Sequence, residues 1–351
     1  MQYSIVISTY PPHFHRVARF LSSCYEHVKD LDKLEVILVV SNGEEHSIRA
    51  TVDPFNKISF KIVTFSNLIK DRYGICISEQ DMLTRMCDPI SGGKWSYQAL
   101  KKLMGVMYSN NPYILVLDSE TLVIRDCSIE EIFLNFFNKN RCYFYTDNSA
   151  EKSPKFKEYG NGGLYTLSES CNKILKKDTL PYYFWEAGNW FFEKDKVMSM
   201  VQYIEEIHNK SLIDVLLDIK PMFEFSLYQF FLYYTHRDQY TFVSVNDEIR
   251  KQLNDDTFYF QQRDRLADTR LGFEETLTIL DNDKMADCYH ALFTRYDLNF
   301  LMFGISWNRC TPQHIRFIEE TESIKFLCTL DSENGPITRG LHLPKLNKVL
   351  T

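Results

Sequence analysis

Four short runs of apolar residues constrain the fold of this chain more than any other feature. Each run has the length and the β-branched content of a buried strand. The segment 14–29, between the first two runs, carries apolar residues at helical spacing. This order predicts an α/β fold with a Rossmann-like, mixed but mostly parallel sheet flanked by helices. The four runs are 3–10 (YSIVISTY), 34–40 (LEVILVV), 58–65 (ISFKIVTF) and 113–118 (YILVLD).

The run 113–118 is almost wholly apolar and finishes on an acid. A run of this kind is typical of a central parallel strand that is covered on both faces. In open α/β sheets ligands bind at the carboxyl ends of the strands, so Asp118, Ser119 and Glu120 lie where a site is expected. A helix over 95–108 is predicted to precede the strand, with one apolar face made of Leu100, Leu103, Met104 and Met107.

Asp118 and Glu120 are spaced i, i+2 directly after this strand. Two carboxylates at that spacing converge on one cation where the chain turns. Hard divalent cations prefer carboxylate oxygens and keep open positions for phosphate. The structural alternative is that Asp118 caps the next turn while Glu120 is solvated. The buried strand before the pair favours the functional interpretation.

Beyond residue 140 the pattern continues and then weakens. After about residue 250 charged stretches interrupt it, which favours a single domain, 1–250, with a C-terminal extension, 251–351, packed on it. The further elements predicted are strands at 141–147 and 240–245, an amphipathic helix at 194–207, a buried aromatic helix at 222–235 and a loop at 150–163.

Composition excludes several classes of protein. The formal net charge of −7 over 351 residues argues against a chain that coats nucleic acid, because phosphate binding needs clustered Lys and Arg. Nine cysteines without a C-x-x-C pair exclude a finger-type zinc site and fit a reducing compartment. The N-terminus lacks the pattern of a signal peptide, and no apolar stretch is long enough to span a membrane. We therefore expect a soluble, cytoplasmic protein.

Four segments together resemble a known family. YILVLDSETLVIRD resembles the D-x-D region of nucleotide-sugar glycosyltransferases of the GT-A fold, and SIVISTY resembles their opening strand. GGKWSYQALKKLMGVMYSNNPYILVLDSET is similar to a pattern of bacterial glycosyltransferase-like proteins, and MFEFSLYQFFLY resembles a stretch that places Glu224 on the family's acid. The resemblance covers about 3–235. It implies a nucleotide-sugar half, about 1–126, and an acceptor half, about 127–250.

The resemblance also implies roles for single residues. Glu120 departs from it by replacing the second Asp, and Asn42 departs by replacing an acid often found after the second strand. Lys101 is the implied diphosphate contact, with Lys102 as its competitor. The implied nucleotide-sugar contacts are Ser8, Thr9, Tyr10, Asn42, Trp95, Gln98, Lys101, Asp118 and Ser119. The implied ligands of a divalent metal, Mn²⁺ or Mg²⁺, are Asp118, Glu120 and His290, and His13 and His15 are further candidates for a phosphate contact.

Glu224 is an acid inside an aromatic stretch that we expect to be buried. Burial raises the pKa of a carboxyl group, which suits a general base that deprotonates an acceptor hydroxyl. Glu186 is the alternative base, and a buried acid satisfied by Arg or Tyr is the structural alternative. Segment 182–192 is a candidate acceptor wall or ordinary core, through Trp185, Asn189 and Trp190.

The leading hypothesis is a metal-assisted, hexosyltransferase-like glycosyltransferase. The resemblance implies a glycan or lipid-linked glycan acceptor of the capsule or lipopolysaccharide kind, and peripheral association with the inner face of the plasma membrane. One rival is a nucleotidyltransferase acting on a sugar phosphate. Pro11-Pro12 and histidines stand where its glycine-rich basic loop would be, which disfavours it. The other rival is a non-catalytic carbohydrate-binding protein of the same fold.

Overall fold

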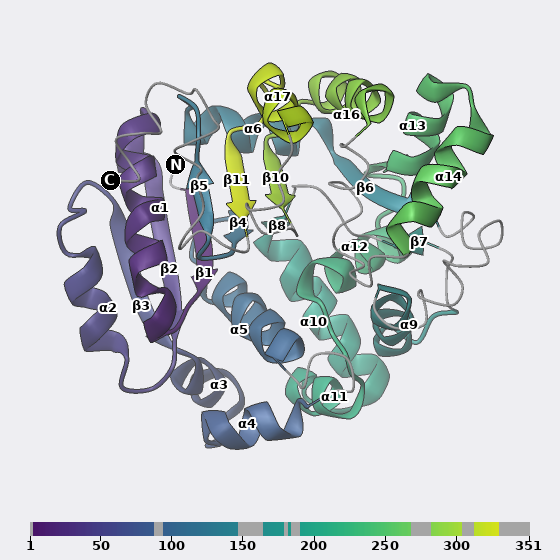
Figure 1. Cartoon of the computed structure of the whole chain (residues 1–351). Coiled ribbons are helices and arrows are strands. Elements are labelled where there is room, and N and C mark those ends of the chain that lie inside the picture. Colours follow the sequence, from purple (N-terminus) through teal and green to yellow (C-terminus); the bar gives the residue numbers. More distant parts are fainter. Residues whose placement is uncertain are drawn as a thin grey trace.

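The computed structural model describes residues 3–87, 94–146, 164–178, 182–183, 190–267, 282–303 and 312–329. Its central sheet has five strands in the order β3-β2-β1-β4-β8 (Figure 1). The first four strands along the chain are mutually parallel, and β8 runs antiparallel to β4. The predicted mixed, mostly parallel sheet is therefore confirmed. The strands are β1 (Tyr3–Ser8), β2 (Leu34–Val40), β3 (Ser59–Thr64), β4 (Tyr113–Leu117) and β8 (Phe191–Glu193).

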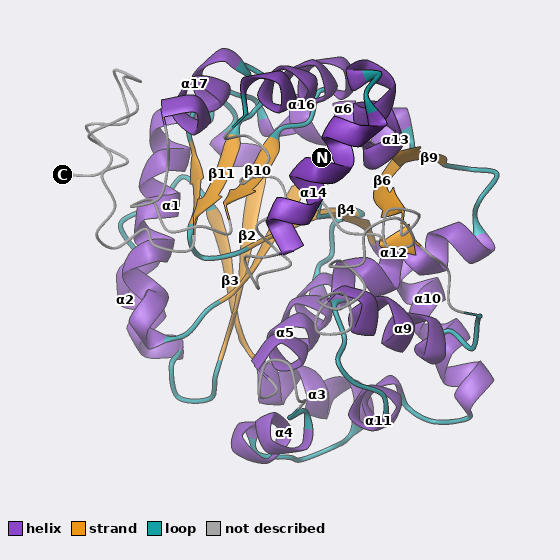
Figure 2. Ribbon diagram, turned by 45° about the vertical axis from the view of Figure 1, so that its right-hand side comes forward, coloured by secondary structure: helices purple, strands orange, loops and turns teal. Residues whose placement is uncertain are grey.

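Helices flank this sheet on both sides, with α1 and α2 on one side and α5 on the other (Figure 2). The predicted helices 14–29 and 95–108 are confirmed within two residues at each end. The helices of the first half are α1 (Phe14–His27), α2 (Glu45–Val52), α3 (Phe65–Tyr73), α4 (Glu79–Arg85), α5 (Lys94–Tyr108) and α6 (Ile129–Lys139), with short 3₁₀ turns η1 (Pro11–His13) and η2 (Leu31–Lys33).

The helix α5 packs closely on the sheet at Gly105. A Cβ atom placed on Gly105 would lie 2.6 Å from Val6 Cγ1 and 2.8 Å from Val39 Cγ2. Only a glycine allows the helix backbone to come this near to β1 and β2. The close approach fixes the position of α5 relative to the strand ends, and α5 carries two of the lysines discussed below.

Later helices form a second group below and beside α5 (Figures 1 and 2). The predicted elements at 194–207 and 222–235 are confirmed as α10 and α12, and every residue of α12 from Glu224 to Leu232 is buried. The predicted loop 150–163 lies outside the described residues. These helices are α9 (Leu164–Ile174), α10 (Lys194–His208), α11 (Leu212–Asp218) and α12 (Glu224–Thr235).

The predicted strands at 141–147 and 240–245 are confirmed as parts of a small second sheet. In it, β6 pairs antiparallel with β7 and parallel with β9. Its strands are β6 (Arg141–Thr146), β7 (Tyr182–Tyr183) and β9 (Thr241–Ser244).

The C-terminal region is more regular than its sequence pattern indicates. Its strand β11 pairs antiparallel with β5 (Thr121–Val123), the short strand that directly follows Glu120. This pairing brings the far end of the described chain to the predicted site. The elements after residue 244 are α13 (Val245–Leu253), α14 (Asp256–Ala267), α16 (Asp283–Tyr296), β10 (Phe300–Phe303), α17 (Pro312–Glu320) and β11 (Phe326–Thr329). Among the described residues, no helix is both long and apolar enough to cross a membrane.

Candidate active site

The carboxyl ends of β1 and β4 meet at one edge of the central sheet. Ile7 pairs with Leu117 in the parallel register, so the residues that follow them leave the sheet side by side. The backbone N–H of Thr9 donates to the carbonyl oxygen of Val39 at 3.1 Å, which holds the chain against β2 for one residue beyond β1. Sequence-predicted residues from both strands, Thr9 and Asp118 among them, therefore share this edge.

Lys102 lies at the centre of a buried cluster at this edge. Its ammonium Nζ is 2.6 Å from Asp118 Oδ1 and 3.6 Å from Glu224 Oε1. The ring centroid of Trp190 lies 4.7 Å from the same nitrogen, within cation–π range. The side chains of Lys102 and Glu224 are 6% and 1% exposed, whereas that of Asp118 is 29% exposed. Asp118 is thus the member of the cluster that solvent and ligands reach.

The cluster shifts the pKa values of Lys102 and Glu224. Burial alone would lower the pKa of Lys102, but the carboxylates of Asp118 and Glu224 overcome it and raise the pKa above its ordinary value. Burial raises the pKa of Glu224, and the nearby Lys102 ammonium offsets only part of this rise. Neither carboxylate oxygen of Glu224 has a hydrogen-bond partner among the described residues. A buried carboxylate without hydrogen bonds costs stability, which is typical of a carboxylate with a functional role.

Glu120 points to a different set of partners. Its Oε1 lies 2.5 Å from Arg16 Nη1 and 3.3 Å from His13 Nδ1, and Ser119 Oγ donates to its Oε2 at 2.9 Å. His13 Nδ1 is also 3.0 Å from Ser119 Oγ, and its Nε2 is 2.7 Å from the hydroxyl of Tyr10. Burial and the neighbouring Asp118 carboxylate raise the pKa of Glu120, although Ser119 and Arg16 oppose the rise. Glu120 is therefore held by the turn after β1, through His13, and by the first turn of α1, through Arg16.

The two acids do not fit a divalent metal as they lie. A Mg²⁺ ion on Asp118 Oδ1, at about 2.1 Å, would be no more than about 4.7 Å from the Lys102 ammonium, which lies 2.6 Å from that oxygen. The Coulomb repulsion there is roughly 7 kcal/mol at an effective dielectric constant of about 20. Glu120 is already paired with Arg16. Within the described parts of the chain, no three His, Cys, Asp or Glu side chains are grouped as metal ligands.

A second polar cluster lies beyond the carboxyl end of β2. Lys101 Nζ donates to Ser41 Oγ at 3.3 Å, and burial lowers the pKa of this lysine. Glu79 accepts from the backbone N–H of Asn42 at 2.8 Å and from the hydroxyl of Tyr97 at 2.6 Å. The structure therefore directs Lys102 towards Asp118 and Lys101 towards the end of β2.

The surroundings of the remaining predicted residues differ, and some of these residues lie outside the described part of the chain. His290 Nδ1 lies 2.9 Å from Thr321 Oγ1, and Gln98 is exposed on α5. Trp190 is 3% exposed; its ring faces the Lys102 ammonium in the buried cluster and also contacts Phe223 in an edge-on arrangement. The predictions for Glu186, Trp185 and Asn189 and for the side chain of Trp95 concern positions outside the described residues. Ser8 ends β1 in a half-buried position.

Two neighbours of the site, Arg16 and Cys328, are not among the residues predicted from the sequence. Arg16 lies in the first turn of α1, where the helix dipole disfavours a cation, and this local conflict is the signal that could have marked it. Cys328 pairs in register with Thr121, and burial together with the Asp118 and Glu120 carboxylates raises its pKa well above the ordinary value. No feature of the sequence near Cys328 indicates this position.

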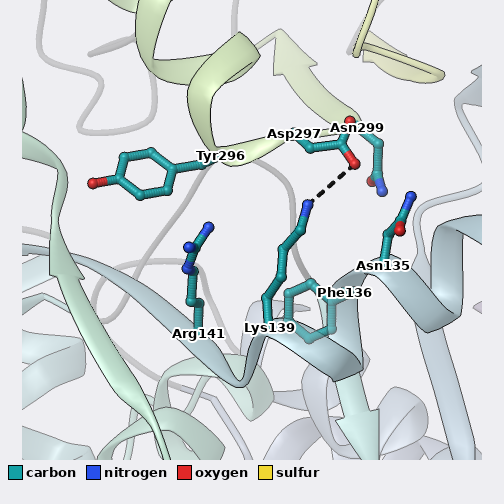
Figure 3. Close-up of a pocket in the computed structure, with 7 residues that line it drawn as sticks. All are labelled: Asn135, Phe136, Lys139, Arg141, Tyr296, Asp297 and Asn299. Atoms are coloured by element: carbon teal, nitrogen blue, oxygen red, sulfur yellow. Dashed lines mark hydrogen bonds and ion pairs between the residues drawn. The ribbon is translucent and has the colours of Figure 1, made fainter.

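A small cavity between α6, β6 and the end of α16 is separate from these clusters (Figure 3). Its volume is about 10 Å³, close to the room that one water molecule needs. Lys139 and Asp297 form an ion pair of 3.2 Å across it, and the buried Oδ1 of Asn299 has no hydrogen-bond partner in the described chain. A bound water would satisfy Asn299, whereas a nucleotide sugar is far too large for this cavity.

Solved structures similar to this chain are glycosyltransferases at low identity. Mouse xyloside xylosyltransferase 1 is 13% identical at a TM-score of 0.39, over 70% of this chain and 86% of its own. The bifunctional glycosyltransferase WbbM is 12% identical at a TM-score of 0.39, over 95% of this chain but 46% of its own, so the chain spans less than half of WbbM. The galactosyltransferase LgtC, solved with donor and acceptor sugar analogs, is 14% identical at a TM-score of 0.36, over 75% of this chain and 83% of its own. At these scores the likeness carries no argument about activity.

Sequence comparison gives a family without an assigned activity. No curated protein matches the chain. The model of a family of unknown function, DUF6492, matches residues 3–302. This match covers most of the chain, and the chain therefore belongs to the family of unknown function DUF6492.

Proposed function

We propose that the chain transfers a sugar from a nucleotide-sugar donor to a glycan acceptor at the carboxyl end of β4. The observation that carries this proposal is the buried bridge by which Lys102 joins Asp118, at the strand end, to Glu224, at the start of α12. The resemblance of the segment around Asp118 to the D-x-D region of GT-A glycosyltransferases supports the same location. Strand ends of this kind are the usual ligand sites of open α/β sheets.

In this proposal Asp118 and Glu224 have different roles. Asp118 is partly exposed and faces the donor, while Lys102 fixes its orientation. Glu224 is the general base that takes the proton from the acceptor hydroxyl if the reaction inverts configuration, and its raised pKa suits that role. Because its side chain is 1% exposed, acceptor binding must open a local path to it. Glu186 remains the alternative base.

The Mn²⁺ or Mg²⁺ ion that the resemblance implies stays a prediction, and no step of the proposed reaction is routed through it. Its expected ligands Asp118 and Glu120 are paired with Lys102 and Arg16. The other finer features are proposals as well. A hexosyl donor, a capsule- or lipopolysaccharide-like acceptor, a division into halves near residue 126 and peripheral association with the inner face of the membrane rest on the resemblance, and a cytoplasmic location rests on the composition.

A donor screen tests this proposal. The purified chain is incubated with a panel of nucleotide sugars and glycan acceptors, and released nucleotide is measured with EDTA and, separately, with Mn²⁺. We expect release from at least one donor and a loss of about 100-fold or more in Asp118→Asn. The matched control is Asp218→Asn, which removes an exposed acid that is paired with Lys210 at 2.8 Å. If no donor binds or reacts under either condition, the proposal is wrong.

A further inference from the structure

The carboxylate of Glu120 has the surroundings of a bound anion. A guanidinium nitrogen of Arg16 lies 2.5 Å from it, a ring nitrogen of His13 lies 3.3 Å from it, and the hydroxyl of Ser119 donates to it at 2.9 Å. Guanidinium, imidazole and hydroxyl groups are also the donors that proteins direct at phosphate oxygens. The set around Glu120 would serve a phosphate equally well.

The position of these groups in the fold supports the same conclusion. Arg16 lies in the first turn of α1, a helix of 14 residues whose first turn contains no acidic residue. The N-cap residue His13 makes no side-chain capping bond there. A cation in the first turn opposes the helix dipole, whereas an anion in front of the turn satisfies both the dipole and the cation. In this structure the anion is the side chain of Glu120, which comes from the other strand end.

The group is also accessible to a ligand. The side chains of His13, Arg16 and Glu120 are 17%, 10% and 14% exposed, whereas Ser119 is 2% exposed, so the contact is partly open to solvent on the side of His13 and Glu120. Asp118, only two residues before Glu120, is 29% exposed. A phosphate that displaced Glu120 would therefore lie beside the acid that we assign to the donor.

We propose that Arg16, His13 and Ser119 form a phosphate site, and that Glu120 occupies it as an internal anion until a phosphate-bearing ligand displaces it. This inference rests on the proposed function only in naming the ligand as a nucleoside diphosphate group. It gives Glu120 a role opposite to that of a metal ligand: its carboxylate competes with the phosphate and does not recruit a cation for it. It also accounts for a glutamate at this position, because the longer side chain extends from the turn after β4 towards α1.

Calorimetry with inorganic pyrophosphate and with UDP, both in EDTA, tests the site directly. Glu120→Gln removes the competing charge and keeps the size of the side chain, so both probes should bind about fivefold more tightly than to the wild type. Arg16→Ala should weaken both by about tenfold. Glu130→Gln is the matched control, because it also removes a carboxylate paired with a cation, Lys33 at 2.5 Å, but far from the site. Melting temperatures check that each variant is folded.

Opposite results overturn the inference. If Glu120 is a metal ligand, the wild type binds UDP with Mn²⁺ but not in EDTA, and Glu120→Gln weakens the binding that is measured with Mn²⁺. Unchanged affinity in both Glu120→Gln and Arg16→Ala also contradicts the proposed site. The donor screen separates this failure from failure of the proposed function. If donor turnover needs Mn²⁺ and is lost in Glu120→Gln, the proposed function stands and the proposed phosphate site is wrong. If pyrophosphate binds more tightly to Glu120→Gln and more weakly to Arg16→Ala but no donor is turned over, the phosphate site stands and the proposed function is wrong.

Discussion

Lys102 Nζ lies 2.6 Å from Asp118 Oδ1, and through this ion pair a helix buried against the central sheet holds the acid at the end of β4. The same ammonium lies 3.6 Å from Glu224 Oε1. One cation thus faces two carboxylates from segments more than a hundred residues apart in the sequence. The bridge joins the proposed donor side of the site to the proposed acceptor side.

Removal of Lys102 should be costly for stability. Lys102→Met leaves the buried Glu224 carboxylate without its cation, and the free energy of unfolding should fall by about 3 kcal/mol. Adding Glu224→Gln to the same chain should recover part of this loss. Urea denaturation at neutral pH measures both changes.

The neighbouring lysine provides the control for this prediction. Lys101 is also buried, but its ammonium donates to a neutral hydroxyl, Ser41 Oγ. Lys101→Met should therefore cost about 1 kcal/mol or less. Equal losses for the two lysines would show that the ion pairs of Lys102 contribute nothing specific.

The stability of the chain should depend on pH through Glu224. Burial raises the pKa of this carboxyl group in the folded state, so folding favours its protonated form. As the pH rises above about 4.3, where an exposed Glu ionises, the unfolded chain loses this proton first and the folded state loses relative stability. Glu224→Gln removes the effect.

Unfolding free energies of wild type and Glu224→Gln between about pH 4 and pH 8 check this sign. Glu224→Gln should have the higher free energy of unfolding at the high-pH end of this range, and its advantage over the wild type should shrink as the pH falls. If instead the wild type loses stability relative to Glu224→Gln as the pH falls, the pKa of Glu224 is lowered by Lys102 and not raised by burial.

The contact between α5 and the sheet should tolerate no side chain at Gly105. A Cβ there meets Val6 Cγ1 at 2.6 Å and Val39 Cγ2 at 2.8 Å. Gly105→Ala gains about 1 kcal/mol of helix propensity, yet overpacking costs about 1–3 kcal/mol. We expect a net loss of about 1 kcal/mol, measured by thermal or urea unfolding.

A second variant distinguishes the clash from other causes. Val6→Ala removes the methyl group nearest to the new Cβ, so Gly105→Ala should cost less in that background than in the wild type. If Gly105→Ala lowers the free energy of unfolding equally in the two backgrounds, the contact between α5 and β1 is not the cause of the loss.

Much of the fold could be predicted because its strands are short apolar runs with clear ends. The strand predicted at 34–40 has these bounds in the structure, and 113–118 ends one residue earlier, which leaves Asp118 as the first residue beyond the sheet. The C-terminal elements could not be predicted in this way. The pairing of β5 with β11 joins two very short strands that are about two hundred residues apart, and local periodicity contains no information about such a pair.

The site was predictable in position but not in its pairings. A strand end followed by two acids indicates where Asp118 and Glu120 lie. Which cation faces each acid depends on the rotation of α5 and on where α1 begins, and these follow from packing at Gly105 and at the end of β1. For this reason local sequence patterns favour Lys101 over Lys102 as the contact and do not indicate Arg16.

The most direct test of the account is donor binding and sugar transfer measured side by side in Glu224→Gln. For a donor identified by the screen, calorimetry gives its affinity and nucleotide release in the presence of acceptor gives the transfer rate. If Glu224 is the general base, donor affinity should stay within about twofold of the wild type and transfer should fall by about 100-fold or more. Transfer at the wild-type rate in this variant would contradict the account, because it would leave the acid bridged by Lys102 to Asp118 without a role in the reaction.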